Sequence, residues 1–151
     1  MSTTSRRQAR EFALRVLYAY EMTHNPIDLI FHDLLMGKLP DENSRQFSKE
    51  LVRISVEHGA EFDEVIRMKA LNWDFSRIAV LDKVILRLGL CELVYFADIP
   101  PKVTINEAIE IAKKYSTEKS GLFINGILDS VLQELRESGR LKKSGRGLLE
   151  I

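Results

Sequence analysis

Residues 76–96 constrain the fold of this chain more than any other segment, because they are apolar on almost every side of a helix. The apolar side chains are Ile78, Val80, Leu81, Val84, Ile85, Leu86, Leu88, Leu90, Leu93, Val94 and Phe96. A helix of this kind needs other elements to cover it on several sides. The charged residues inside it make it too polar for a membrane span. The sequence therefore predicts a buried central helix with other helices packed round it.

Five further amphipathic segments have apolar residues at helical spacing. They are 5–22 with Ser5 as N-cap, 26–35 with Asn25 as cap and Pro26 at the first helical position, 43–66 with a bend at Gly59, 104–115 opened by a Thr104–Glu107 capping box, and 120–136. Alternating β-strand patterns are absent. The predicted fold is all-α, a compact helical bundle of two small subdomains. The first three helices form one subdomain, and the helices round segment 76–96 form the other.

Domain organisation follows from the breaks in this pattern. Pro100 and Pro101 end the central helix, and no Gly- or Ser-rich linker separates the two helical groups. We therefore predict one helical domain over residues 1–137. Residues 138–151 are rich in Gly, Ser, Lys and Arg without any period, which predicts a basic flexible tail.

Sequence features that would indicate catalysis or secretion are missing. The single cysteine, Cys91, excludes an internal disulfide, and the absence of a leader or a long apolar run favours the cytoplasm. The three histidines do not have metal-ligand spacing, and no glycine-rich phosphate loop or nucleophile elbow occurs. His58 and Cys91 lie on apolar stripes, where a core role is expected. We predict a protein that is not an enzyme and has no cofactor and no metal.

Charge is distributed unevenly, although 22 basic and 22 acidic residues cancel to a net charge of zero. Residues 1–20 carry a net +3, residues 136–151 carry a net +3, and the remaining body carries −6. This asymmetry is typical of a protein with a basic surface for one partner and an acidic surface, here expected around Asp82 and Glu92, for another. Basic, solvated chain ends are the alternative interpretation.

Two clusters combine residue types suited to nucleic acid. Arg6, Arg7 and Arg10 stand three and four residues apart near the start of the first helix, and the planar guanidinium group suits phosphate oxygens and bases. Cations oppose the dipole at a helix N-terminus, so this arrangement has a local cost that function would explain.

The second cluster joins the last two helices, where Lys113, Lys114, Tyr115, Lys119 and Phe123 mix cations with rings. That mixture is typical of surfaces that bind single-stranded RNA. A buried Phe123 beside a solvated helix end is the alternative.

Four blocks of the sequence together resemble the NusB family of transcription antitermination proteins. The blocks are residues 6–18, 77–93, 100–115 and 123–129, and they follow one another in the family's order. The resemblance covers residues 6 to about 135 and leaves only the tail outside.

The resemblance implies an all-helical fold of two subdomains and a noncatalytic role. It implies binding to the boxA element of nascent ribosomal RNA, together with the ribosomal protein NusE, in an antitermination complex with RNA polymerase. By position, the resemblance assigns RNA binding to Arg6, Arg7, Arg10, Lys113, Lys119 and Phe123, and partner binding to Tyr18 and Asp82. At positions 82 and 119 the chain has Asp and Lys where the family pattern has Glu and Asp.

Two other functions are compatible with parts of the pattern. One is a protein–protein assembly module that forms a homodimer through the arginine-rich face. The other is the NusB-like domain of an RNA-modifying methyltransferase, which is disfavoured because this chain has no glycine-rich cofactor loop or catalytic cysteine motif.

Overall fold

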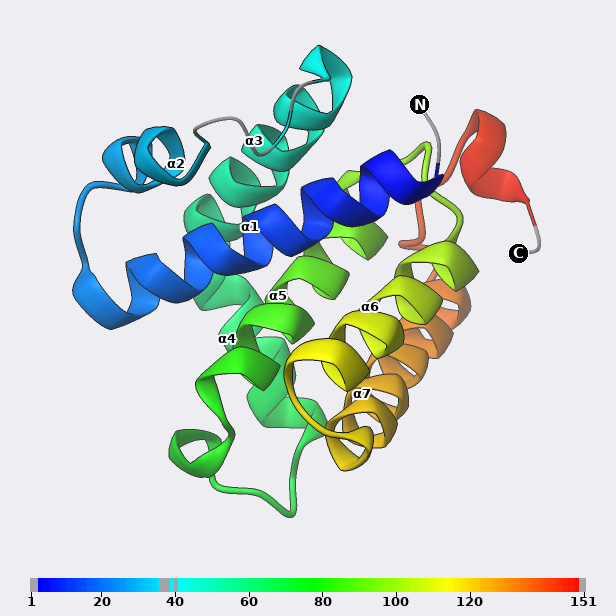
Figure 1. Cartoon of the computed structure of the whole chain (residues 1–151). Coiled ribbons are helices and arrows are strands. Elements are labelled where there is room, and N and C mark those ends of the chain that lie inside the picture. Colours follow the sequence, from blue (N-terminus) through cyan, green and yellow to red (C-terminus); the bar gives the residue numbers. More distant parts are fainter. Residues whose placement is uncertain (1–2, 36–38, 40, 150–151) are drawn as a thin grey trace. The chain divides into compact units, whose positions relative to one another are not determined.

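A computed structural model describes residues 3–35, 39 and 41–149, and these residues divide into two compact units. Unit 1 is Met1–Glu57 and unit 2 is His58–Ile151. Figure 1 shows helices connected by short turns, and the described residues contain no β-strand. The all-α prediction is confirmed. The boundary of 137/138 between a helical domain and a tail stays a prediction.

Unit 1 contains three helices, α1 (Thr3–Thr23), α2 (Ile27–Leu35) and α3 (Glu42–Glu57). α1 packs on both α2 and α3. Phe12 of α1 meets Phe31 of α2 edge to face, with ring centroids 5.3 Å apart. Of the predicted apolar stripe of the first helix, Phe12, Ala13, Val16 and Leu17 are buried, and Tyr20 is only half-buried.

The start of α1 differs from the prediction. Ser5 lies inside the helix, because α1 already includes Thr3 and Thr4. The predicted N-cap at Ser5 is therefore wrong. The predicted stop of the second helix at Gly37 and Pro40 lies outside the described residues.

The segment predicted as one bent helix over 43–66 consists of two helices. α3 ends at Glu57, and α4 (Gly59–Lys69) begins after His58, whose φ of −109° and ψ of 19° are not helical. The bend predicted at Gly59 is thus a complete break, and it coincides with the boundary between the units. As a result α4 belongs to unit 2, although the sequence grouped it with the first subdomain.

His58 is a polar junction residue and not the core histidine that the sequence predicted. Its Nδ1 lies 3.1 Å from Glu61 Oε2 and 3.1 Å from the Tyr95 hydroxyl. The imidazole stacks on the Tyr95 ring with centroids 4.3 Å apart. The Tyr95 hydroxyl also donates a hydrogen bond of 2.8 Å to Glu61 Oε2. These contacts tie the start of α4 to the end of α5 (Val80–Tyr95).

Partial burial and the hydrogen bond to the Glu61 carboxylate raise the pKa of Tyr95 to about 12. We expect the ultraviolet titration of the four tyrosines to contain one late component near this value, and Tyr95→Phe to remove it. Glu61→Gln should move the component toward 10, because the carboxylate charge and its hydrogen bond both favour the neutral phenol. The pKa of Tyr95 is higher in the folded protein than in the unfolded chain. Its contribution to the free energy of unfolding is therefore present below pH 10 and is lost as the pH rises toward 12. A late component that persists in Tyr95→Phe would contradict the assignment.

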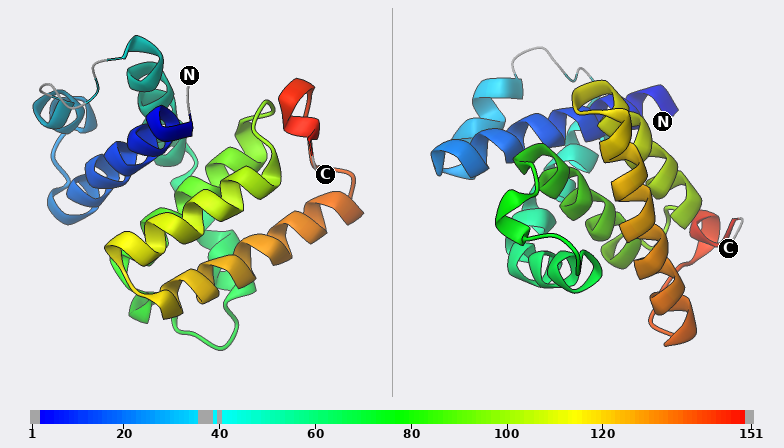
Figure 2. Two further views of the ribbon diagram at one scale, coloured as in Figure 1. Left: turned by 45° about the vertical axis from the view of Figure 1, so that its right-hand side comes forward. Right: turned by 90° about the horizontal axis from the view of Figure 1, so that it is seen from below.

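Unit 2 is built round α5, as predicted. α5 contacts α4, α6 (Pro101–Tyr115) and α7 (Glu118–Glu137), and α6 lies alongside α7 in Figure 1 and in both views of Figure 2. Cys91 is fully buried in α5, as the sequence predicted. Gly89 lets α7 approach closely, because a Cβ there would lie 2.9 Å from Cδ1 of Leu128.

The central helix is shorter than predicted because its first residues form a separate turn. η1 (Phe75–Arg77) is a short 3-10 helix that Asp74 caps by accepting a hydrogen bond of 3.1 Å from the Ser76 amide. Ile78 then adopts an extended conformation with ψ 131°, and α5 begins at Val80. The side-chain cap of Asp74 competes with a continuous helix through this region.

The predicted capping box at the start of the next helix is also wrong. α6 begins at Pro101, where a proline costs no hydrogen bond because the first helical amide has no partner inside the helix. Thr104 therefore lies inside α6, and its hydroxyl donates a hydrogen bond of 3.0 Å to Glu92 of α5. Thr104 and Glu92 are both buried, so this polar pair links two core helices.

Residues 138–149 contact the end of α5. Lys143 Nζ donates to the carbonyl oxygens of Glu92 and Phe96 at 3.0 Å and 2.7 Å, and Ser144 N donates to Ala97 O at 3.0 Å. Burial lowers the pKa of Lys143. A short 3-10 helix, η2 (Gly145–Leu148), follows, with Gly147 pressed against the Ala97 carbonyl. The sequence predicted a flexible tail here, and it did not indicate these contacts, in which a cation satisfies the last carbonyls of a helix.

A helix that crosses a membrane must be long and apolar. None of the described helices has the length and the apolar character that crossing a membrane requires.

Candidate nucleic-acid interface

The three arginines predicted to bind RNA differ in exposure. Arg7 is exposed on the first turns of α1, Arg6 is half-buried, and Arg10 is only 3% exposed. The guanidinium carbons of Arg6 and Arg10 lie 4.4 Å and 5.4 Å from the centroid of the Phe47 ring in α3. Cations over an aromatic face are stabilised by the ring quadrupole. The side chains of Arg6 and Arg10 therefore pack on Phe47, and Arg7 is the most accessible of the three.

The lysine and aromatic cluster of unit 2 lies where α6 meets α7. Lys113 is exposed in the last turn of α6, and its Nζ lies 3.8 Å from Glu110 Oε1. A Cβ at Gly121 would lie 3.7 Å from Lys113 Cγ, which places the stem of Lys113 beside the first turn of α7. Lys119 is exposed and precedes Phe123 by four residues, so both lie on one face of α7. Lys119 and Phe123 thus share one face of α7, whereas Lys113 lies beside Gly121, which is two residues from both and lies on another side of the helix.

A chain of hydroxyl groups fixes the turn between α6 and α7. Thr117 is the N-cap of α7 and accepts a hydrogen bond of 3.0 Å from Ser120 N. Ser116 Oγ lies 2.9 Å from Ser120 Oγ, and Ser120 Oγ donates to Asp82 Oδ2 at 2.9 Å. The first turn of α7, which carries Lys119, is therefore held to the first turn of α5. Sequence reasoning did not identify this role of Ser120.

Asp82 lies in a different environment from the one predicted for a partner-binding residue. It is only 8% exposed, and its Oδ2 accepts the Ser120 hydroxyl. Its Oδ1 is buried and has no hydrogen-bond partner among the described residues. Glu92, expected to share an acidic surface with Asp82, is 2% exposed and accepts from Thr104. These two carboxylates hold helices together and do not form an open acidic face.

Tyr18 has the exposure expected of a partner-binding residue. It is 38% exposed, and Met22, one turn later on α1, is 57% exposed. Two large apolar side chains on the solvent side of one helix are typical of a protein-binding surface.

One aromatic residue of this region was missed in the sequence. Trp73 lies between α4 and η1, is 61% exposed, and meets Phe123 with ring centroids 5.7 Å apart at an interplanar angle of 64°. Phe123 itself is half-buried, so the prediction that it lies on the inner face is only partly correct. A large ring in a short non-helical segment, as in Asn72-Trp73-Asp74, is the signal that could have identified it.

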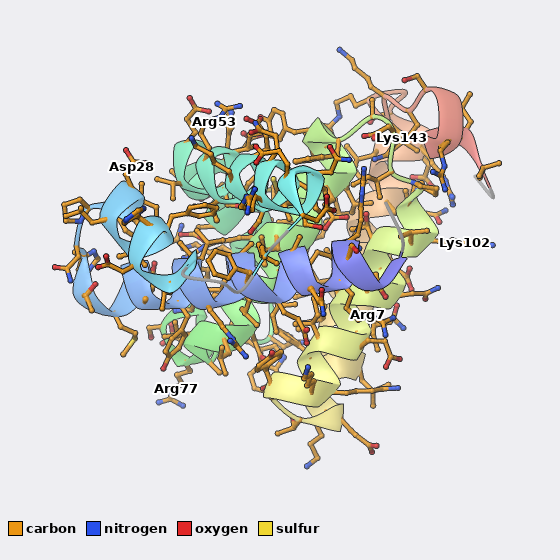
Figure 3. All side chains as sticks on the ribbon, turned by 45° about the horizontal axis from the view of Figure 1, so that its top comes forward. Arg7, Asp28, Arg53, Arg77, Lys102 and Lys143 are labelled. Atoms are coloured by element: carbon orange, nitrogen blue, oxygen red, sulfur yellow. The ribbon has the colours of Figure 1, made fainter. Side chains whose placement is uncertain are left out.

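A pocket of about 630 Å³ lies between α2 and α3, with Asp28 and Arg53 on its lining, and contains none of the predicted site residues. In Figure 3 Asp28 and Arg53 extend from these two helices. Within the described part of the chain, no three His, Cys, Asp or Glu side chains gather as a metal site would require.

Most of the chain is similar to known proteins of one family. The model of the NusB family matches residues 7–133. The chain is 44% identical over 147 residues to the transcription antitermination protein NusB of Salinibacter ruber, covering 97% of this chain and 92% of that protein. It is 43% identical over 137 residues to the protein of the same name from Methylacidiphilum infernorum, covering 90% and 94%.

Solved structures show the same relationship. The NusB of T. maritima superimposes with a TM-score of 0.80 at 35% identity, covering 89% of this chain and 94% of that one. A chain from a crystal structure of the antitermination factors NusB and NusE in complex with double-stranded RNA gives a TM-score of 0.80 at 26% identity, covering 88% and 99%. The family name describes transcription antitermination and not an enzymatic reaction. This chain belongs to the NusB family.

Proposed function

We propose that this protein is a noncatalytic antitermination factor that binds boxA-type RNA of nascent ribosomal transcripts together with the ribosomal protein NusE. The observation that carries the proposal is the similarity to a NusB chain solved with NusE and double-stranded RNA. The match covers 99% of the length of that NusB chain. Assembly with RNA polymerase and a cytoplasmic location follow from the same role.

The described residues offer suitable chemistry for RNA on both units. Arg7 is exposed at the start of α1, and Figure 3 shows it beside the first turns of that helix. Lys113 is exposed at the end of α6, and Lys119 is exposed at the start of α7 on the same helix face as Phe123. Cations bind the phosphate backbone, and rings stack on unpaired bases. Within unit 1, Arg6 and Arg10 pack on Phe47 of α3 and so hold the part of α1 that carries Arg7.

Tyr18 is the residue of the NusE proposal with the clearest structural support, because it is exposed beside Met22. Asp82 would act indirectly in this proposal, by fixing the start of α5 through Ser120. Binding of NusE is expected to be weakened by Tyr18→Ala and to depend on Asp82 only through helix position.

The RNA part is tested by Arg7→Ala. We expect the affinity for a boxA-type RNA to fall about tenfold, because one charge-assisted phosphate contact is lost. The slope of log K against log salt should fall by about 0.7, the value for one phosphate of a single strand. Binding is measured by fluorescence anisotropy of labelled RNA at several salt concentrations, with and without NusE.

Arg53→Ala is the matched control for this experiment. Arg53 is also an exposed arginine of unit 1, and it lies on α3, outside the proposed interface, where it pairs with Glu50 and Glu57. Its removal should change neither affinity nor salt slope. Equal effects of the two substitutions, or none for Arg7→Ala, would reject the proposed interface. Sedimentation of the pure protein completes the test, since a stable dimer unaffected by RNA would favour the self-assembly function.

A further inference from the structure

We infer that Trp73 stacks on an unpaired base of single-stranded RNA and, with Phe123, forms an aromatic platform on unit 2. The inference rests on the proposed RNA-binding function and adds a residue and a mode of contact to it. Trp73 belongs to the segment between α4 and η1, which none of the predicted site residues occupies.

The exposure and the orientation of the indole carry the first step. Trp73 is 61% exposed, although a side chain of this size is usually largely buried. Its contact with Phe123, at 5.7 Å and 64°, fixes one side of the ring and leaves most of its surface open. The Trp73 amide donates to the Ala70 carbonyl at 3.0 Å, which also orders the backbone of the segment. A large ring held in place while still exposed is preorganised for stacking.

The charges near Trp73 favour RNA over an apolar protein segment. Two cations lie over the ring of Phe75 in η1, with Arg67 Cζ at 4.2 Å and Lys83 Nζ at 4.3 Å from its centroid. Arg77 is exposed at the end of η1, and Figure 3 shows it extending away from the ribbon. Lys119 is one turn before Phe123 on α7. Rings among cations match the chemistry of a single strand, whose bases stack while its phosphates carry negative charge.

The neighbouring carboxylates do not cancel this preference. Asp74 Oδ1 accepts hydrogen bonds from the Ser76 amide at 3.1 Å and the Ser76 hydroxyl at 2.9 Å, so it is turned onto its own backbone. Asp82 is buried against Ser120. Asp74 keeps its negative charge, because its hydrogen-bond donors are neutral, and Glu64 lies 3.7 Å from Arg67. The four cations named above outnumber these two exposed carboxylates.

Trp73 is the only tryptophan of the chain, so its emission reports directly on the platform. We expect a labelled boxA-type single-stranded RNA to quench this emission over the concentration range in which anisotropy shows binding. Trp73→Ala should lower the affinity about tenfold and leave the salt slope unchanged, because stacking involves no phosphate. Trp73→Phe should retain most of the affinity, since a ring remains.

Leu71→Ala is the matched control, because Leu71 is 83% exposed in the same segment but carries no ring. It should leave RNA affinity unchanged. RNA with 5-bromouridine at successive positions should cross-link to Trp73 in the wild-type protein, which tests the contact without any substitution.

The outcomes separate this inference from the proposed function. RNA that binds without quenching or cross-linking, together with unchanged affinity in Trp73→Ala, would overturn the platform while RNA binding stands. If Trp73→Ala abolished NusE binding measured in the absence of RNA and left RNA affinity unchanged, the ring would be assigned to a protein partner. That result would also overturn the inference. No RNA binding by the wild-type protein would reject both.

Discussion

Leu128→Ala is expected to lower the free energy of unfolding by about 3–4 kcal/mol, as deletions of this size do in well-packed cores. Leu128 is fully buried in α7, and its methyl groups lie against Gly89 of α5. Glycine has no side chain that could move into the cavity, so little relaxation is expected. Urea denaturation followed by circular dichroism measures the change, and the slope with urea should stay the same.

Leu122→Ala supplies the comparison on the same helix. Leu122 is 74% exposed, so its truncation should change the free energy of unfolding by less than about 0.5 kcal/mol. If both substitutions cost the same, the packing of α7 on α5 described above is wrong. Adding Gly89→Ala to Leu128→Ala should recover about 1–2 kcal/mol, because the new methyl group fills the cavity and alanine favours the helix. In the wild-type background the same methyl group would meet Leu128 and give no such gain.

Asp63→Ala is expected to cost about 2–3 kcal/mol, because it removes the carboxylate from a largely buried ion pair. Asp63 of α4 accepts two hydrogen bonds from Arg87 of α5, at 2.6 Å from Nε and 3.0 Å from Nη2. The two side chains are 20% and 13% exposed, so water replaces the lost partner only in part. Thermal and urea unfolding of the variant provide the measurement.

Glu64→Ala tests whether the effect of Asp63→Ala arises from burial. Glu64 is the next residue of α4 and lies 3.7 Å from Arg67 in a pair that is 66% and 52% exposed. Exposed pairs contribute little, so its removal should cost less than about 0.5 kcal/mol. If Glu64→Ala lowered the free energy of unfolding as much as Asp63→Ala does, burial would not be what distinguishes the two ion pairs.

The exposure of the site residues changes how the proposed RNA surface is to be tested. Arg6 and Arg10 pack on Phe47, so substitution of either residue alters α1 and α3 as well as RNA affinity. Arg7 is exposed, and it is therefore the more accessible probe of phosphate binding. In the same way Asp82 supports the first turn of α7, and its substitution would affect Lys119 and Phe123 indirectly.

The helices themselves were largely predictable from the sequence, because burying one apolar stripe gives a local period that any core must satisfy. The second predicted helix, which the sequence starts at Pro26, corresponds to α2, which begins one residue later at Ile27, and segment 76–96 contains the central helix α5. Errors occur at helix ends, where single residues interrupt or begin a helix independently of the apolar period. Asp74 caps a separate turn before α5, Pro101 begins α6 three residues before Thr104, and His58 separates α3 from α4.

The sequence by itself determined the helical class, the central position of α5, the residue types suited to RNA and the family resemblance, because each depends on local spacing and composition. Only the tertiary structure decided which of these residues are accessible. It buried Arg10 and Asp82, set Lys143 against the last carbonyls of α5, and placed Trp73 beside Phe123, fifty positions later in the chain. Exposure and such pairings arise from contacts between segments far apart in the chain, which no local pattern encodes.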